Sequence, residues 1–193
     1  QEEALKLYDA GADIYLITNF SSPMYVTERM EIERGPEHYQ MSMTELERFR
    51  NLEWEMQKYP QIQSLKEANL LLGTRRIFGI YQIRDDLPGE NYAFMNMSFI
   101  ESHGMQIKKE DYKLVYVGEL SGNMSLDDIF EKFNIDRPED FRGHSLSVSD
   151  IIVLNDGEKV TAHFVDSISF EQLDSFLNLE EQVLSELAYE VGE

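Results

Sequence analysis

The stretch IIVLNDGEKVTAHFV, residues 151–165, decides how the second half of this chain folds. Two runs rich in apolar and β-branched residues, 151–154 and 159–165, flank the tripeptide Asn-Asp-Gly at 155–157. Asn, Asp and Gly tolerate positive φ angles, and two apolar runs around such a turn are typical of a β-hairpin. We therefore expect two antiparallel strands that meet at this turn.

His163 lies in the second run of this predicted hairpin. Val160, Ala162 and Phe164 alternate with Thr161 and His163 along the sequence. Because successive side chains of a strand point to opposite faces, His163 should share a face with Thr161. The pattern predicts a partly exposed histidine that faces a neighbouring strand.

Two further segments have the composition of strands in the same sheet. Residues 77–83, IFGIYQI, and 112–120, YKLVYVGEL, are rich in β-branched and aromatic residues. The turn sequence Asp-Leu-Pro-Gly at 86–89 predicts that residues 91–95, NYAFM, pair with the first of them as a hairpin. Together with the 151–165 hairpin, these segments predict a small, mostly antiparallel sheet.

Helices are expected to flank this sheet. Ser125, followed three residues later by Asp128, has the spacing of a capping box and predicts a helix with apolar residues up to Phe133. A shorter helix should begin near Ser98 and end at Gly104. A third is expected from about 171 to 190, and its last part should pack a Leu/Val face on the rest of the domain.

The first 75 residues are expected to form a separate part that contains a pair of helices. Two Ser-x-x-Glu capping boxes, at 42–45 and 64–67, predict helices over about 43–59 and 65–72. Pro60 should stop the first helix, and Gly73 predicts a left-handed cap after the second.

Residues 13–17 and 24–33, ahead of the helix pair, resemble short strands, although a helix fits the second segment as well. The whole pattern predicts an α+β fold. Residues 1–75 form a helical N-terminal part with a short β portion, 76–178 a domain with a small antiparallel sheet flanked by helices, and 179–193 a C-terminal helix.

The composition excludes several classes of protein. The 193 residues are 42% hydrophobic, which suffices for a packed core, and they include no cysteine. Disulfides, thiolate zinc sites and cysteine nucleophiles are therefore excluded. No apolar run reaches the roughly 18 residues of a membrane helix, and the first residues lack the pattern of a signal peptide. We expect a cytoplasmic protein without a membrane partner.

The formal net charge of −20 argues against binding to nucleic acid. Affinity for a phosphate backbone depends on Lys and Arg, and 37 acidic residues outnumber 17 basic ones. Residues 76–193 carry about −15 of this charge, so the acidic residues extend into both parts of the chain. We expect no direct binding to nucleic acid, whereas a protein partner remains compatible with this charge.

The segment FRGHSLSVSDIIVL, residues 141–154, contains the densest group of polar candidates. Its pentapeptide GHSLS, 143–147, is one glycine short of the G-x-S-x-G elbow of many hydrolases. An elbow needs a strand before the serine and a helix after it, whereas here a loop precedes and a strand follows. The alternation of Ser145, Ser147 and Ser149 with apolar residues instead predicts the polar edge of a strand, and short hydroxyls there can satisfy main-chain groups.

His144, Asp150, His163 and Asp166 offer imidazole and carboxylate groups, which could hold a metal or perform acid–base chemistry. Their spacing matches no known metal-binding pattern, and the chain contains no glycine-rich phosphate loop. We predict no catalytic residue, no bound metal and no cofactor.

Residues 78–177 resemble the YodL-like domain family. The resemblance is carried by FGIYQI and DYKLVYVGEL, by the run from Phe133 to Leu154, and by Val165-Asp166-Ser167 with Phe170. Domains of this family occur in Firmicutes, alone and within large multidomain proteins of conjugative elements and phages. The resemblance implies a mobile-element setting and no particular reaction.

The resemblance and the residues lead to one main hypothesis, a non-enzymatic accessory or protein-interaction module of a bacterial mobile element. The alternatives are an acidic protein that imitates DNA to occupy a defence enzyme, and a small hydrolase that uses the region of His144 and His163. The sequence predicts no oligomeric state. Any shared functional surface should lie in the 143–150 loop and the facing residues 163–167, with the candidates His144, Ser145, Ser147, Ser149, Asp150, His163, Asp166 and Ser167.

Overall fold

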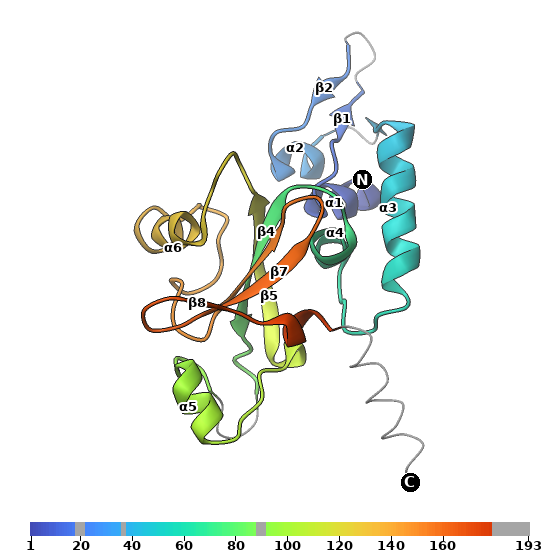
Figure 1. Ribbon diagram of the computed structural model, residues 1–193. Coiled ribbons are helices and arrows are strands. Elements are labelled where there is room, and N and C mark those ends of the chain that lie inside the picture. The colour runs from blue at the N-terminus through green and yellow to red at the C-terminus, as the bar shows by residue number, and fades with distance from the viewer. Residues whose placement is uncertain (18–21, 36–37, 88–91, 179–193) are drawn as a thin grey trace. The chain divides into compact units, whose positions relative to one another are not determined.

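The computed structural model describes residues 1–17, 22–35, 38–87 and 92–178 and divides the chain into two compact units, 1–73 and 74–193. Helices and antiparallel sheets occur in both units, so the α+β class predicted from the sequence is confirmed (Figure 1). Within the described ranges no helix is long and apolar enough to cross a membrane.

The first unit combines four helices with a small sheet among its described residues. The sheet has the order β2-β1-β3 and is antiparallel throughout. The unpredicted first helix packs Ala4 and Leu7 inward. The elements are α1 (Glu2–Asp9), β1 (Tyr15–Leu16), β2 (Met24–Tyr25), α2 (Arg29–Glu33), β3 (Tyr39–Gln40), α3 (Met43–Met56) and α4 (Leu65–Leu72).

The segment 24–33 is strand only at its first two residues, so the longer strand was wrong, whereas the alternative of a helix is correct for Arg29–Glu33. Glu28 and Glu31 form a reciprocal capping box, which starts α2 at Arg29. The capping side chain here is a glutamate, so the Ser/Thr pattern of a capping box did not reveal this helix.

The predicted helix pair is confirmed, although the first helix ends at Met56 and does not reach Pro60, and the predicted cap at Gly73 was wrong. Ser42 and Ser64 each accept a hydrogen bond at 3.1 Å from the amide three residues later. Gly73 does not adopt a left-handed conformation, because its φ is −79° and its ψ is 175°. A Cβ atom at this position would lie 2.3 Å from the Asn69 carbonyl oxygen, so close approach to the helix explains the glycine.

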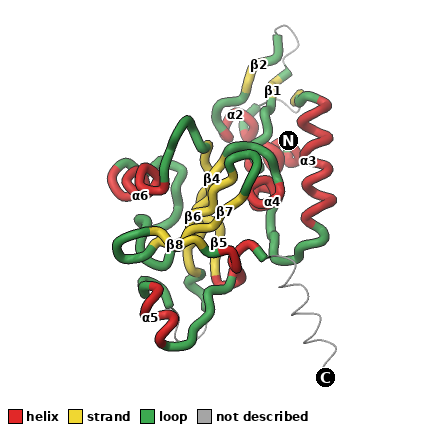
Figure 2. The backbone as a smooth tube through the Cα atoms, in the orientation of Figure 1, coloured by secondary structure: helices red, strands yellow, loops and turns green. Residues whose placement is uncertain are grey.

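The second unit is built on a five-stranded antiparallel sheet of order β5-β4-β6-β7-β8, whose strands lie side by side in Figure 2. Its central strand β4 is buried at all seven positions. The other elements are α5 and α6 with two short 3₁₀ helices. Their bounds are β4 (Ile77–Ile83), α5 (Met97–Ser102), η1 (Lys109–Asp111), β5 (Tyr112–Glu119), α6 (Leu126–Ile135), β6 (Ile151–Asn155), β7 (Val160–Val165), β8 (Phe170–Gln172) and η2 (Asp174–Leu177).

The hairpin predicted for 151–165 is confirmed. β6 and β7 pair in register through Val153 and Ala162. Gly157 has a φ of 94°, and the Asn155 side chain accepts a hydrogen bond from its amide at 2.9 Å. The turn residues thus supply both the positive φ and the local hydrogen bond that their types predict.

The hairpin predicted between 77–83 and 91–95 was wrong. β4 pairs with β5 on one side and β6 on the other, so both of its edges are occupied. Tyr92–Met95 form a turn instead, and Phe94 has a φ of 64°, which no strand residue adopts. Pro88 and Gly89, the centre of the predicted turn, lie outside the described residues.

Helix α6 covers one face of the sheet. Ile129 and Phe133 are fully buried against Phe78, Ile80 and Ile152. Its capping box is complete, because the Ser125 hydroxyl accepts from the Asp128 amide and the Asp128 carboxylate accepts from the Ser125 amide. These contacts confirm the helix predicted to begin at Ser125.

On the opposite face, Phe176 from η2 makes edge-on ring contacts with Tyr81 and Tyr112 at centroid distances of 5.3 and 5.4 Å. The helix predicted to begin at about 171 does not begin there, since residues 170–172 pair with β7 as β8. The predicted helix over 179–193 lies outside the described residues.

Candidate functional site

The segment 141–150 is a loop with a tight turn at its end, and the strand begins only at Ile151. The predicted loop that leads into strand 151–154 is therefore confirmed, whereas the serines do not form the polar edge of a strand. The Asp150 amide donates to the Ser147 carbonyl at 3.1 Å, which closes a four-residue turn. Ser149 occupies the third position of this turn with a φ of 76°, a conformation that normally favours glycine.

Asp150 is the buried centre of this loop. Its side chain is enclosed, and the residue exposes 1% of its surface. Oδ2 accepts hydrogen bonds from the Ser147 amide at 2.9 Å and from Gln82 Nε2 at 3.0 Å. A buried carboxylate with two donors acts as a bridge between the loop and strand β4.

Gln82 forms hydrogen bonds with three groups of the loop, two on His144 and one on Asp150. Its Nε2 lies 2.9 Å from the His144 carbonyl and 3.0 Å from Asp150 Oδ2, and its Oε1 accepts from the His144 amide at 3.1 Å. Gln82 is 1% exposed. Gly143 allows this approach, because a Cβ atom there would lie 2.3 Å from Gln82 Oε1. We call Gln82, Gly143, His144, Ser147 and Asp150 the Gln82 cluster.

His144 has a partly exposed ring on top of the Gln82 cluster. Its Nε2 lies 3.7 Å from Asp150 Oδ1, and its Nδ1 lies 2.8 Å from the Ser145 carbonyl oxygen and 3.0 Å from Gln82 Nε2. The ring therefore contacts the main chain of Ser145. A Ser–His nucleophile would instead need the imidazole at the serine hydroxyl.

The environment of Asp150 raises the pKa of its carboxyl group above that of an exposed aspartate. Burial raises the pKa of Asp150 from its ordinary 3.8 to about 6, against the lowering effects of the Ser147 amide, the charge of His144 and the Gln82 amide. Desolvation disfavours the charged carboxylate more than its partners stabilise it. Asp150 is consequently a buried group with a pKa of about 6.

Ser149 connects the loop to the segment before α5. Its hydroxyl accepts a hydrogen bond from the Phe94 amide at 2.8 Å, and its carbonyl accepts from the Tyr112 hydroxyl at 2.9 Å. Phe94 and Ser149 are the two non-glycine residues with positive φ in the part of the chain that the structure describes. The hydrogen bond thus joins the two unusual backbone positions of the domain directly.

Phe94 presents its ring to solvent at this junction. The side chain is 62% exposed, and the ring centroid lies 5.4 Å from that of His144. A bulky residue with a positive φ is rare, and such conformations concentrate at functional positions.

Asp166 and Ser167 lie at the far end of β7. The Asp166 carboxylate accepts from the Ser167 amide at 2.7 Å and from the Met97 amide at 3.4 Å, so it reaches the start of α5. The Ser149 amide donates to the Val165 carbonyl at 2.9 Å. The structure therefore brings the 143–150 loop, the end of β7 and residues 94–97 together.

His163 does not belong to this group. Its Nε2 lies 2.9 Å from the Thr161 hydroxyl, and the half-buried ring has a pKa lowered by burial and then by the charge of Lys159. The predicted shared face with Thr161 is confirmed. In the described ranges, no group of three or more His, Cys, Asp or Glu residues is arranged to hold a metal ion.

Sequence reasoning missed Gln82 and Phe94, which are central to this region. Gln82 is the single polar residue of the strand IFGIYQI, and a polar side chain in an apolar central strand is a usable signal of a buried network. Phe94 gave no such signal, because the partner of its amide, Ser149, lies 55 residues away in the sequence.

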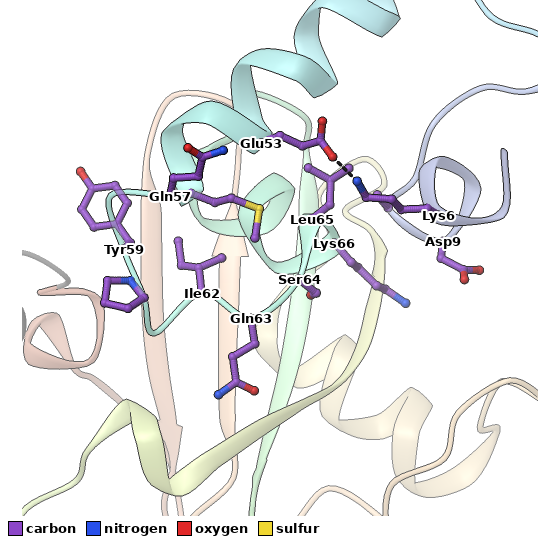
Figure 3. A pocket seen from close by; sticks show the side chains of 13 residues that line it. Lys6, Asp9, Glu53, Gln57, Tyr59, Ile62, Gln63, Ser64, Leu65 and Lys66 are labelled. Atoms are coloured by element: carbon purple, nitrogen blue, oxygen red, sulfur yellow. Dashed lines mark hydrogen bonds and ion pairs between the residues drawn. The ribbon is translucent and has the colours of Figure 1, made fainter. Parts of the chain in front are cut away.

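A separate cavity of about 760 Å³ lies in the first unit (Figure 3). Residues of α1, the end of α3, the following loop and the start of α4 line it, and Met56, Ile62 and Leu65 supply apolar surface. Lys6 of the lining is paired with Glu53, and Asp9 with Arg29 at 2.9 Å. These pairs give Lys6, Glu53 and Asp9 partners within the unit, and Lys66 is the fourth charged residue of the lining.

The family comparison places the Gln82 cluster inside a known domain. The model of the YodL-like domain matches residues 77–176, more than half of the 193 residues. Comparisons with curated proteins and with solved structures found no match. All five residues of the Gln82 cluster, together with Phe94 and Ser149, fall within the matched range. The chain belongs to the YodL-like domain family, as the resemblance of residues 78–177 predicted.

Proposed function

We propose that this chain is a non-enzymatic protein-interaction module that serves a bacterial mobile element in the cytoplasm. The setting follows from the resemblance, since YodL-like domains occur in proteins of conjugative elements and phages. The interaction role is supported by the polar side chains of the 143–150 loop, which form hydrogen bonds within their own domain.

One observation carries this proposal. Asp150, Gln82, Ser147 and Ser149 all bond to main-chain groups of their own domain. A catalytic group has to reach a substrate, whereas these groups have internal partners and three of the four residues are at most 2% exposed. What the loop leaves at the surface is the ring of His144 beside the exposed ring of Phe94. Exposed aromatic side chains are enriched at protein interfaces.

The hydrolase alternative receives no comparable support. The His144 imidazole contacts the Ser145 carbonyl at 2.8 Å, and His163 contacts Thr161 at 2.9 Å. Neither arrangement prepares a serine hydroxyl for attack. Direct binding to nucleic acid also conflicts with the charge of −20.

Affinity purification from cells that carry the mobile element tests the proposal. The tagged chain should retain one protein of the element at a defined ratio, and a Phe94→Ala variant should lose it. A Trp54→Ala variant is the matched control, because Trp54 is a 65% exposed aromatic residue of the first unit. If no protein is retained, or if both variants retain it equally, the proposed role of this surface is wrong.

A further inference from the structure

The ring of His144 faces an oxygen atom with each of its two nitrogens. Nδ1 lies 2.8 Å from the Ser145 carbonyl oxygen, and Nε2 lies 3.7 Å from Asp150 Oδ1. A neutral imidazole carries a hydrogen on one nitrogen only, and an ionised carboxylate carries none. One of the two approaches therefore lacks a hydrogen unless the pair of His144 and Asp150 binds one additional proton.

The amide of Gln82 does not supply this hydrogen. Its Oε1 accepts from the His144 amide at 3.1 Å, which identifies Nε2 as the donor. The two hydrogens of Nε2 serve the His144 carbonyl at 2.9 Å and Asp150 Oδ2 at 3.0 Å. The Nδ1 atom of His144, 3.0 Å from the same Nε2, therefore donates its own hydrogen to the Ser145 carbonyl. In this tautomer the lone pair of Nε2 faces Asp150 Oδ1.

The free position for a proton lies between Asp150 Oδ1 and His144 Nε2. The other carboxylate oxygen, Oδ2, already accepts from the Ser147 amide and from Gln82. The Asp150 side chain is 2% exposed, so an added proton relieves the cost of a buried negative charge. The pKa of Asp150, which burial raises to about 6, agrees with this position.

Tyr112 and Asp85 are ionisable neighbours of the pair. Burial and neighbouring charges, that of Asp150 among them, raise the pKa of Tyr112 on strand β5, so its hydroxyl stays neutral. Asp85 is exposed, and its pKa is lowered first by Lys113 and also by His144, so it stays ionised. Neither Tyr112 nor Asp85 takes up a proton between about pH 8 and pH 5.

We propose that His144 and Asp150 form a pH-operated latch, in which one shared proton holds the imidazole ring over the buried carboxyl group. With this proton, each ring nitrogen approaches its oxygen with a hydrogen between them. Without it, the lone pair of Nε2 faces an ionised carboxylate. The ring is 43% exposed, so it turns away from Asp150 towards solvent when the proton is lost.

Release of the ring changes the surface that contains Phe94. The ring centroids of His144 and Phe94 lie 5.4 Å apart, and Phe94 is 62% exposed. The Ser149 hydroxyl holds the Phe94 amide at 2.8 Å, and this bond does not involve the proton. The backbone of Phe94 therefore stays in place while its ring loses a neighbour. The latch stands without the proposed interaction role, and only its effect on a protein partner rests on that role.

NMR of the isotope-labelled full chain tests the latch by a titration from pH 8 to pH 5. One reporter is the Cε1–H signal of the His144 ring, and the other is the Ser147 amide, which bonds to Asp150 Oδ2. Both signals should shift with the same midpoint, because the proton belongs to the pair. The nuclear Overhauser effect between the His144 and Phe94 rings should strengthen as pH falls.

Two Asp-to-Asn variants separate the latch from a general effect of charge. Asp150→Asn offers an amide hydrogen to Nε2 at every pH, so the contact with Phe94 should persist at pH 8 and the transition of the Ser147 amide should be lost. Asp85→Asn is the matched control, because it removes the exposed carboxylate that acts on His144. It should leave the common transition in place and move its midpoint by less than about half a pH unit.

Three results would overturn the latch. They are a wild-type contact with Phe94 that is unchanged from pH 8 to pH 5, different midpoints for the His144 ring and the Ser147 amide, and a contact that Asp150→Asn loses at high pH as wild type does. The first two need no variant, so they decide the matter even if Asp150→Asn fails to fold. The titration also needs no partner, so a failed latch and a failed purification experiment are separate outcomes.

Discussion

Stability should depend on pH through Asp150, and an Asp150→Asn variant isolates this dependence. The folded state raises the pKa of Asp150 from 3.8 to about 6, so the folded protein binds this proton more tightly than the unfolded chain does. For an acid with a raised pKa, the contribution to stability is complete below about pH 4 and is lost as pH rises through about 6. Wild type should therefore gain stability relative to the variant as pH falls.

The magnitude follows from the two pKa values. Each pKa unit corresponds to about 1.4 kcal/mol, so the difference between 3.8 and about 6 gives on the order of 3 kcal/mol. No large discount for solvent applies, because Asp150 is 1% exposed. The assay is urea unfolding of both proteins from pH 8 to pH 4.5, analysed as the difference in the free energy of unfolding, and about 2 of these 3 kcal/mol should appear within that range.

A His144→Gln background gives the control for this measurement. The charge of His144 lowers the pKa of Asp150, so its removal should move the pH dependence of the difference upward. The reasoning is refuted if the difference between wild type and Asp150→Asn stays constant over this pH range. It is also refuted if wild type gains stability relative to the variant as pH rises, since Asp150 would then be stabilised as a carboxylate.

Three substitutions test the packing around the same loop. Gly143→Ala should cost about 1–3 kcal/mol in thermal or urea unfolding, because its Cβ would lie 2.3 Å from Gln82 Oε1; unchanged stability would contradict the close approach. Gln82→Leu should cost about 3 kcal/mol, since it leaves the His144 amide and the Asp150 carboxylate short of buried partners; a loss below about 1 kcal/mol would mean that water replaces the amide. Phe94→Gly should be about 1 kcal/mol more stable than Phe94→Ala, because glycine adopts a φ of 64° without strain; equal stability would contradict the left-handed backbone.

Local signals in the sequence were sufficient for most elements of the second unit. The Asn-Asp-Gly turn, the helix that begins at Ser125 and the apolar strand at 77–83 were each predicted correctly from residues within the element itself. The predicted pairing of 91–95 with β4 was wrong because β5 occupies one edge of β4 and β6 occupies the other. Which strands occupy these edges cannot be told from any single segment. The helix predicted near 171 was wrong because Phe170–Gln172 gain strand pairing from β7.

The candidate surface was predictable in part. The 143–150 loop and the residues near 166 are brought together, since Ser149 bonds to Val165 and Asp166 reaches Met97. The roles of Gln82 and Phe94 were not predictable, because both depend on partners more than 50 residues away in the chain. His163 was grouped with this surface because it lies in the strand that faces the loop, whereas its ring contacts the Thr161 hydroxyl.

Photo-crosslinking from position 94 tests the central claim most directly. Benzoylphenylalanine would replace Phe94 in the full chain, expressed in cells that carry the mobile element, and would replace Trp54 in a parallel sample. We predict one discrete protein adduct from position 94 and none from position 54. An adduct from position 54 alone, or no adduct from position 94, would contradict a protein-interaction module that binds through Phe94.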